Sequence, residues 1–276
     1  MTPIHSRVTT PVLGVAVNTF DMEGAVAHIH AFLQGHCKGY VCVAGVHGVM
    51  EAQRDSRLLD VYAGAELAVP DGMPLVWVGR LQGHPSMQRV TGPDLMLEIF
   101  RRPEFADTTH FFYGGREGIA EDLRDKMISQ FPWVKIVGTY TPPFHELTDA
   151  EQQKFAAQIN QVKPDIIWVG ISCPRQEIFM ASHLSRLDTK LMFGVGAAFD
   201  YHTGHIRDSP QWMKTAGLQW LHRLAQDPRR LWRRYLRNNP AFVWRIGLQL
   251  LGLQRRPVPA KWQSDKAPSA HLTTTK

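Results

Sequence analysis

Short apolar runs alternate with segments of helical periodicity along the first 200 residues of the chain. Several of the runs are apolar almost throughout, such as Ile166–Ile171 and Leu191–Val195. Runs of this kind are typical of strands that helices cover on both faces. The predicted strands are Tyr40–Val46, Glu66–Val69, His110–Tyr113, Val134–Gly138, Ile166–Ile171 and Leu191–Val195.

Amphipathic segments of helical length separate these runs. The predicted helices are Val49–Ala63, Met73–Leu81, Pro93–Arg101, Gly118–Phe131, Asp149–Val162 and Pro174–Leu187. Strands that alternate with helices at this spacing predict the α/β class. We therefore expect a Rossmann-like, mainly parallel sheet with helices on both faces, formed by a catalytic body of residues 1–199.

Small and polar residues follow several of the predicted strands, where the loops of an open parallel sheet bind ligands. Val69–Gly72 reads V-P-D-G, which is an ordinary turn sequence and also places the carboxylate of Asp71 at a strand end. The glycine pairs at 114–115 and 194–196 do not complete G-x-G-x-x-G. An NAD(P)-dependent oxidoreductase is therefore a weaker alternative.

Positive charge is concentrated in the last quarter of the chain. Residues 200–276 contain 14 Lys and Arg against 4 Asp and Glu, a net charge of +10, whereas residues 1–199 contain 17 against 21, a net charge of −4. Five of the eight tryptophans also lie after residue 199. Such a segment is expected to meet an anionic partner, either phospholipid, nucleic acid or a phosphorylated substrate.

Residues 200–253 are predicted to form a basic helical appendage, followed by a loose tail at 254–276. Asn239-Pro240 is expected to begin a second helix in this appendage. Its apolar stripe would consist of Phe242, Val243, Ile246, Leu250 and Leu253. A basic amphipathic helix with aromatic residues favours an anionic membrane over nucleic acid. A non-catalytic module that binds either of these partners is the second alternative.

The remaining composition excludes several classes of protein. Three cysteines without a C-x-x-C pair do not make a disulfide framework. The N-terminal segment lacks the apolar core of a signal peptide, and no run of 18 apolar residues predicts a membrane-spanning helix. There is no D-x-D motif and no histidine cluster with metal-ligand spacing, so neither a metal nor another cofactor is expected.

Five separated motifs together resemble the WecG/TagA/CpsF glycosyltransferases, glycosyltransferase family 26, over residues 10–245. The motifs occur in the order that the family shows. They are V-P-D-G at 69–72, R-V-x-G at 89–92 followed by Asp94, G-x-x-x-P-R-Q-E at 170–177, G-V-G-A-A-F-D at 194–200 and W-L-H-R-L-x-x-x-P-x-R-x-x-R at 220–233.

The resemblance implies an inverting, metal-independent transfer from a UDP-sugar to an undecaprenyl-diphosphate-linked sugar, in bacterial surface polysaccharide or exopolysaccharide synthesis. The family's base falls on Asp71, and its donor or phosphate contacts fall on Arg89 and Gln176. Its appendage arginines fall on Arg223, Arg230 and Arg233, which are spaced to share nearly one helix face. An aspartate with the ordinary pKa of about 3.9 is a weak base, which suffices if the acceptor hydroxyl loses its proton late.

Three positions depart from the family pattern. Val43-Ala44-Gly45 stands where members carry T-x-N, Asp208 stands in place of the R-A-P arginine, and Gln219 replaces a frequent glutamate. The donor therefore stays open between glucose and N-acetylmannosamine or mannosaminuronate, and the acceptor sugar and the oligomeric state are also open. The resemblance places the protein in the cytoplasm, peripheral on the inner face of the plasma membrane and without a nucleic-acid partner.

Overall fold

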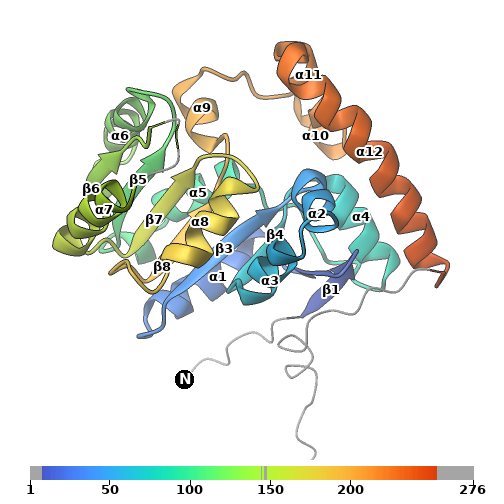
Figure 1. Ribbon diagram of the computed structural model, residues 1–276, viewed down its shortest axis with the longest axis horizontal. Coiled ribbons are helices and arrows are strands. Elements are labelled where there is room, and N and C mark those ends of the chain that lie inside the picture. The colour runs from blue at the N-terminus through green and yellow to red at the C-terminus, as the bar shows by residue number, and fades with distance from the viewer. Residues whose placement is uncertain (1–7, 144, 146–147, 254–276) are drawn as a thin grey trace, which may run out of the picture.

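A computed structural model describes residues 8–143, 145 and 148–253 of the chain (Figure 1). Its centre is a six-stranded sheet in the order β4-β3-β8-β7-β5-β6, and every neighbouring pair is parallel. The strands are β3 Gly39–Ala44, β4 Leu67–Pro70, β5 Thr109–Gly114, β6 Lys135–Tyr140, β7 Ile166–Gly170 and β8 Leu191–Gly194. The predicted α/β class and Rossmann-like parallel sheet are confirmed.

Helices cover both faces of the sheet. Successive strand residues point to opposite sides, and the apolar side chains on each side pack against helices. Trp168 packs into the apolar layer on one face, and its neighbour Val169 packs into the layer on the other face. One layer contains α2 Val46–Ala52, α3 Ser56–Gly64, α7 Asp149–Val162 and α8 Arg175–His183. The other contains α1 Met22–Leu33, α5 Gly92–Arg101, α6 Ile119–Gln130 and α9 Ala198–Thr203, with the 3-10 turn Pro103–Phe105 after α5.

An antiparallel hairpin that the hydrophobic pattern did not predict forms a separate two-stranded sheet beside the β4 edge. It consists of β1 Thr9–Val12 and β2 Val15–Asn18, and α4 Met73–Leu81 packs against it. The side-chain oxygen of Asn18 accepts a hydrogen bond from the backbone N–H of Ala68 at 2.7 Å. The hairpin therefore gives a backbone N–H at the edge of β4 a hydrogen-bond acceptor.

The predicted helix Val49–Ala63 is wrong as a single element, because the chain forms α2 and α3 there. The break lies at Asp55, whose backbone is extended and whose carboxylate accepts the N–H of Arg57 at 3.0 Å. An aspartate in this position caps a new helix by satisfying a backbone donor that would otherwise be unpaired. Local capping chemistry thus outweighs the continuous apolar periodicity.

The appendage contains α10 Gln211–Thr215, α11 Gln219–Gln226 and α12 Pro228–Leu250. The predicted new helix at Asn239-Pro240 is wrong, because α12 is continuous and Pro240 lies inside it. A proline in a helix interior removes one backbone hydrogen bond and costs about 3 kcal/mol. Contacts on both sides of Pro240 hold the two halves of α12 in one line along the side of the body (Figure 1).

The apolar stripe predicted for this helix is divided between two environments. Phe242 and Ile246 are only 4% and 7% exposed and belong to the core of the body. Gln249 bonds with the β1–β2 hairpin through Pro11 and Leu13. The rest of the stripe is exposed, namely Val243, Leu250 and Leu253. The end of α12 is therefore part of the folded body, while its outer face is free.

In the described part of the chain, no helix is both long enough and apolar enough to cross a membrane. The loose tail predicted for residues 254–276 lies outside the described residues.

Candidate active site

A large cavity lies between the carboxyl ends of the central strands and the helices of the appendage. Its volume is about 1370 Å³. The loop after β7, the start of α8 and the segment 204–207 line one part of it. Residues of α11 and α12 line the other part. The arrangement agrees with the general rule that ligands of open parallel sheets bind at the carboxyl ends of the strands.

Asp71 lies at the end of β4, beside the end of β3. Its backbone N–H donates to the carbonyl of Ala44 at 2.8 Å, and Gly72 follows with a positive φ of 104°, which suits glycine. Burial raises the pKa of Asp71 to about 6, although the positive charges of Arg89 and Arg223 oppose this rise. The structure therefore corrects the expectation of an ordinary aspartate: Asp71 is a stronger base than a free carboxylate.

Gly45 lies beside this carboxylate. A Cβ atom added to Gly45 would lie 3.4 Å from the backbone oxygen of Asp71 and 3.5 Å from its Oδ2 atom. The larger side chain that the family pattern places at this position would therefore touch Asp71.

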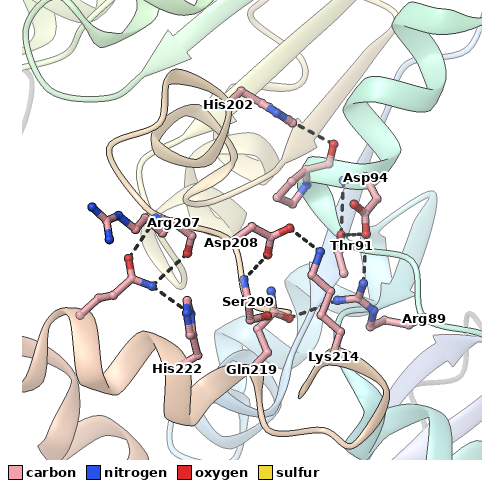
Figure 2. Close-up of polar contacts among 12 residues, drawn as sticks. Arg89, Thr91, Asp94, His202, Arg207, Asp208, Ser209, Lys214, Gln219 and His222 are labelled. Carbon is pink, nitrogen blue, oxygen red and sulfur yellow. Dashed lines mark hydrogen bonds and ion pairs between the residues drawn. The ribbon is translucent and has the colours of Figure 1, made fainter. Parts of the chain in front are cut away.

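Arg89 connects the body with the appendage near Asp71 (Figure 2). Its Nη1 atom donates to Oε1 of Gln219 on α11 at 3.1 Å, and its Nη2 atom donates to Oδ2 of Asp94 at 3.2 Å. The Thr91 hydroxyl donates to the same Asp94 oxygen at 2.7 Å. Gln219, one of the departures from the family pattern, thus bonds with a predicted site residue.

Asp208, a second departure, fastens the segment between α9 and α10. Its carboxylate accepts the backbone N–H of Ser209 at 2.8 Å and forms an ion pair with Lys214 (Figure 2). Nearby, the Gln226 side chain bonds with both backbone groups of Arg207, at 3.0 and 2.9 Å. These bonds hold the segment against α10 and α11, so that it lines the cavity.

Gln176 is buried beneath the cavity and does not line it. Its Nε2 atom donates to Oε1 of Glu177 at 2.9 Å, and its Oε1 atom accepts the N–H of Gly196 at 2.9 Å. Glu177 is fully buried, which raises its pKa, and a hydrogen bond joins it to the Cys173 thiol. The predicted donor contact is thus placed under the Gly194–Gly196 loop, where it holds the loop in position.

Two of the three predicted appendage arginines line the cavity, and the third does not. Arg223 and Arg230 line the cavity, and the guanidinium of Arg223 lies 5.3 Å from the ring centre of Tyr201. Arg230 is paired with Asp227 at 2.5 Å. Arg233 is exposed outside the cavity lining, with its guanidinium 5.2 Å from the ring centre of Trp232.

Three residues near the site were missed by the sequence motifs. Arg234 lines the cavity in the position expected for Arg233. The Tyr201 hydroxyl is buried without a hydrogen-bond partner among the described residues, and burial raises the pKa of Tyr201 to about 12. Asp71 and Arg223 act electrostatically on both Tyr201 and Tyr235. Only the helical periodicity around Arg234 could have indicated any of these positions.

The site offers a proton acceptor beside a cavity rich in arginine. Arginines stabilise negative charge, and a carboxylate with a raised pKa accepts a proton from a hydroxyl group. In the described residues, no group of three or more His, Cys, Asp and Glu is arranged to hold a metal ion.

The family match identifies the protein as a glycosyltransferase. The profile of the Glycosyl transferase WecG/TagA/CpsF family matches residues 10–256, and the chain belongs to this family. It is also similar to two curated proteins that are both named N-acetylglucosaminyldiphosphoundecaprenol N-acetyl-beta-D-mannosaminyltransferase. The protein of Bacillus spizizenii strain W23 is 26% identical over 229 residues, which are 83% of this chain and 87% of the relative. The protein of Bacillus subtilis strain 168 is 28% identical over 185 residues, which are 67% and 70% of the two chains.

Family membership decides between the enzyme classes that the sequence left open. The chain is a hexosyltransferase, and the oxidoreductase and the non-catalytic binding module are set aside.

Proposed function

We propose that this protein transfers a hexosyl unit from a UDP-sugar to an undecaprenyl-diphosphate-linked sugar in the synthesis of a bacterial surface polysaccharide or exopolysaccharide. The observation that carries the proposal is Asp71, a carboxylate whose pKa burial raises to about 6. It lies outside the cavity lining but within electrostatic range of Arg223, which lines the cavity. Two similar proteins are named for a lipid-diphosphate acceptor, which supports this substrate class.

In the proposed reaction, Asp71 accepts the proton of the acceptor hydroxyl as that oxygen attacks the anomeric carbon. The bond to the UDP oxygen breaks on the opposite face, so the anomeric configuration inverts. The departing diphosphate takes the electron pair of the broken bond, and Arg223 and Arg230 offset its charge without a metal ion. Arg89 and Gln176 hold the donor side of the site, Gln176 through the loop that ends at Gly196.

The donor is a glucose-type or an N-acetylmannosamine-type UDP-sugar. The names of the two relatives favour N-acetylmannosamine. Gly45, where the family pattern carries asparagine, lies beside the Asp71 carboxylate, and this departure keeps a glucose-type donor open. Both donors therefore belong in the test.

The outer face of α12 supports a peripheral position on the cytoplasmic face of the plasma membrane. The exposed apolar residues of α12, together with Leu251, which follows it directly, are Trp232, Leu236, Val243, Trp244, Leu250 and Leu251. The exposed guanidinium groups of Arg229 and Arg233 lie on the same helix. Aromatic and apolar side chains enter the interfacial zone of a bilayer, while each arginine near an anionic surface contributes about 1 kcal/mol.

The test is a transfer assay with purified full-length protein. UDP-glucose, UDP-N-acetylmannosamine and UDP-N-acetylmannosaminuronate are each offered with a lipid-diphosphate-linked N-acetylglucosamine, and the products are identified by mass spectrometry. We expect a single hexosyl addition with one of these donors and the release of UDP. Stabilisation by UDP in a thermal-shift measurement supports the same site. If no UDP-sugar is bound or consumed, the proposal is refuted.

A further inference from the structure

Two neighbouring arginines of α12 lie in opposite environments. Arg234 is half-buried and lines the cavity, whereas Arg233 is exposed outside the lining. We propose that Arg234, and not Arg233, binds a diphosphate group at the transfer site. This inference rests on the proposed function and assigns a specific contact to it.

The anchoring of α12 determines which arginine enters the cavity. Asn238, one turn after Arg234, is buried: its Oδ1 atom accepts from Arg54 at 2.8 Å, and its Nδ2 atom lies 2.9 Å from Nδ1 of His47. Leu231, one turn before Arg234, is also buried and lines the cavity. The inward face of the helix is therefore fixed on both sides of Arg234.

Arg233 lies about 100° around the helix axis from Arg234 because an α-helix has about 3.6 residues per turn. This rotation carries its side chain to the outer face, where the guanidinium lies near the ring of Trp232. Arg233 and Arg234 are therefore adjacent in sequence but lie on different faces of α12, with only Arg234 at the cavity.

The charge of Arg234 is left uncompensated by the protein. In the described part of the chain, Arg234 has no ion pair and no side-chain hydrogen bond, whereas Arg230 is paired with Asp227 at 2.5 Å. Its charge acts on the His47 imidazole and on the Cys173 thiol, which line or adjoin the same part of the cavity. A half-buried cation without a partner is unfavourable, and an anion bound in the cavity would offset this cost.

The cavity favours an anion of more than one charge. Its described lining contains six arginines and two carboxylates, and both carboxylates are already paired, Asp200 with Arg116 and Asp227 with Arg230. The planar guanidinium group matches the oxygens of a phosphate with two parallel hydrogen bonds. Both UDP and the lipid-linked acceptor carry a diphosphate group, so the assay must distinguish the two sources.

The experiment compares Arg234→Ala, Arg234→Lys, Arg233→Ala and Arg237→Ala in the full-length protein. Arg237 lies in the same exposed stretch of α12 and serves as the control for loss of one positive charge. Calorimetric titration with UDP measures the donor side. The KM for a short-chain prenyl-diphosphate-linked sugar, measured in solution, reports the acceptor side. The melting temperature verifies that each variant folds.

We expect Arg234→Ala to weaken either UDP affinity or the acceptor KM by about 10- to 100-fold, as is typical for one lost charge-assisted contact. Arg234→Lys should restore part of the loss, and Arg237→Ala should remain within twofold of the wild type. A loss in the UDP titration identifies the donor diphosphate as the ligand, and a loss in the acceptor KM identifies the lipid diphosphate.

Unchanged values for Arg234→Ala in both measurements, with an active wild type, overturn this inference and leave the proposed function intact. An equal loss in Arg233→Ala also overturns it, because the two arginines would then be equivalent. A wild-type protein that neither binds UDP nor transfers a sugar refutes the proposed function and this inference together.

Discussion

Replacing Asp71 with asparagine should abolish most of the activity and stabilise the folded protein at the same time. Asparagine retains the size of the side chain and removes both the charge and the proton acceptor. A residue that serves only the fold would lose stability on such a change. The opposite signs of the two effects are therefore specific for a buried base.

The magnitude follows from the pKa of Asp71, which burial raises from 3.8 to about 6. Because one pKa unit corresponds to about 1.4 kcal/mol, keeping Asp71 ionised in the folded protein costs up to about 3 kcal/mol. This cost is present above pH 6, where both the folded and the unfolded chain are ionised. It decreases as the pH falls from 6 towards 3.8 and is absent below, where both states are protonated.

The measurement is urea unfolding of wild type and Asp71→Asn at several pH values between 4 and 8, together with transfer kinetics. We expect Asp71→Asn to be more stable than the wild type by up to about 3 kcal/mol at pH 8, and this difference should fall below about 1 kcal/mol at pH 4. Its turnover should fall by about 10²- to 10⁴-fold. The wild-type kcat/KM should fall about tenfold per pH unit below pH 6.

Asp165→Asn is the matched control for the sign. Burial raises the pKa of Asp165, but hydrogen bonds from Thr109 and the ion pair with Lys190 outweigh this effect and lower it below the ordinary value. Asp165→Asn should therefore be less stable than the wild type at pH 8, and this difference should shrink as the pH falls through the pKa of Asp165. If Asp71→Asn were less stable than the wild type at pH 8, or kept activity within a few-fold, the assignment of Asp71 as a buried base would be wrong.

Three further predictions concern the appendage and the leaving group. Asn238→Ala breaks the bonds to Arg54 and His47 and should cost about 2 kcal/mol in urea unfolding, with reduced turnover; a silent change would contradict the anchoring of α12. Replacing Val243 and Trp244, which are 70% and 69% exposed, with serine should weaken co-sedimentation with anionic vesicles without changing UDP affinity. Transfer should persist after EDTA treatment, and loss that Mg²⁺ or Mn²⁺ restores would refute the role of the arginines at the departing diphosphate.

The amino-acid sequence by itself determined the strands of the parallel sheet and the strand-end position of the proposed base. Apolar runs such as Ile166–Ile171 are local signals, and a run that is apolar on both faces has few alternatives to a covered strand. The V-P-D-G motif ends the predicted strand Glu66–Val69, so local signals alone place Asp71 at a strand end. The family motifs then indicated the chemistry.

Only the tertiary structure decided the pKa of Asp71 and which arginines lie close to it. The pKa of Asp71 depends on burial and on Arg89 and Arg223, which are distant in sequence and meet it only after folding. The continuity of α12 through Pro240 and the inward direction of Arg234 depend on the contacts of Asn238 with the body. Periodicity along a helix gives the angle between two side chains, but the surface against which the helix packs decides which of them faces the site.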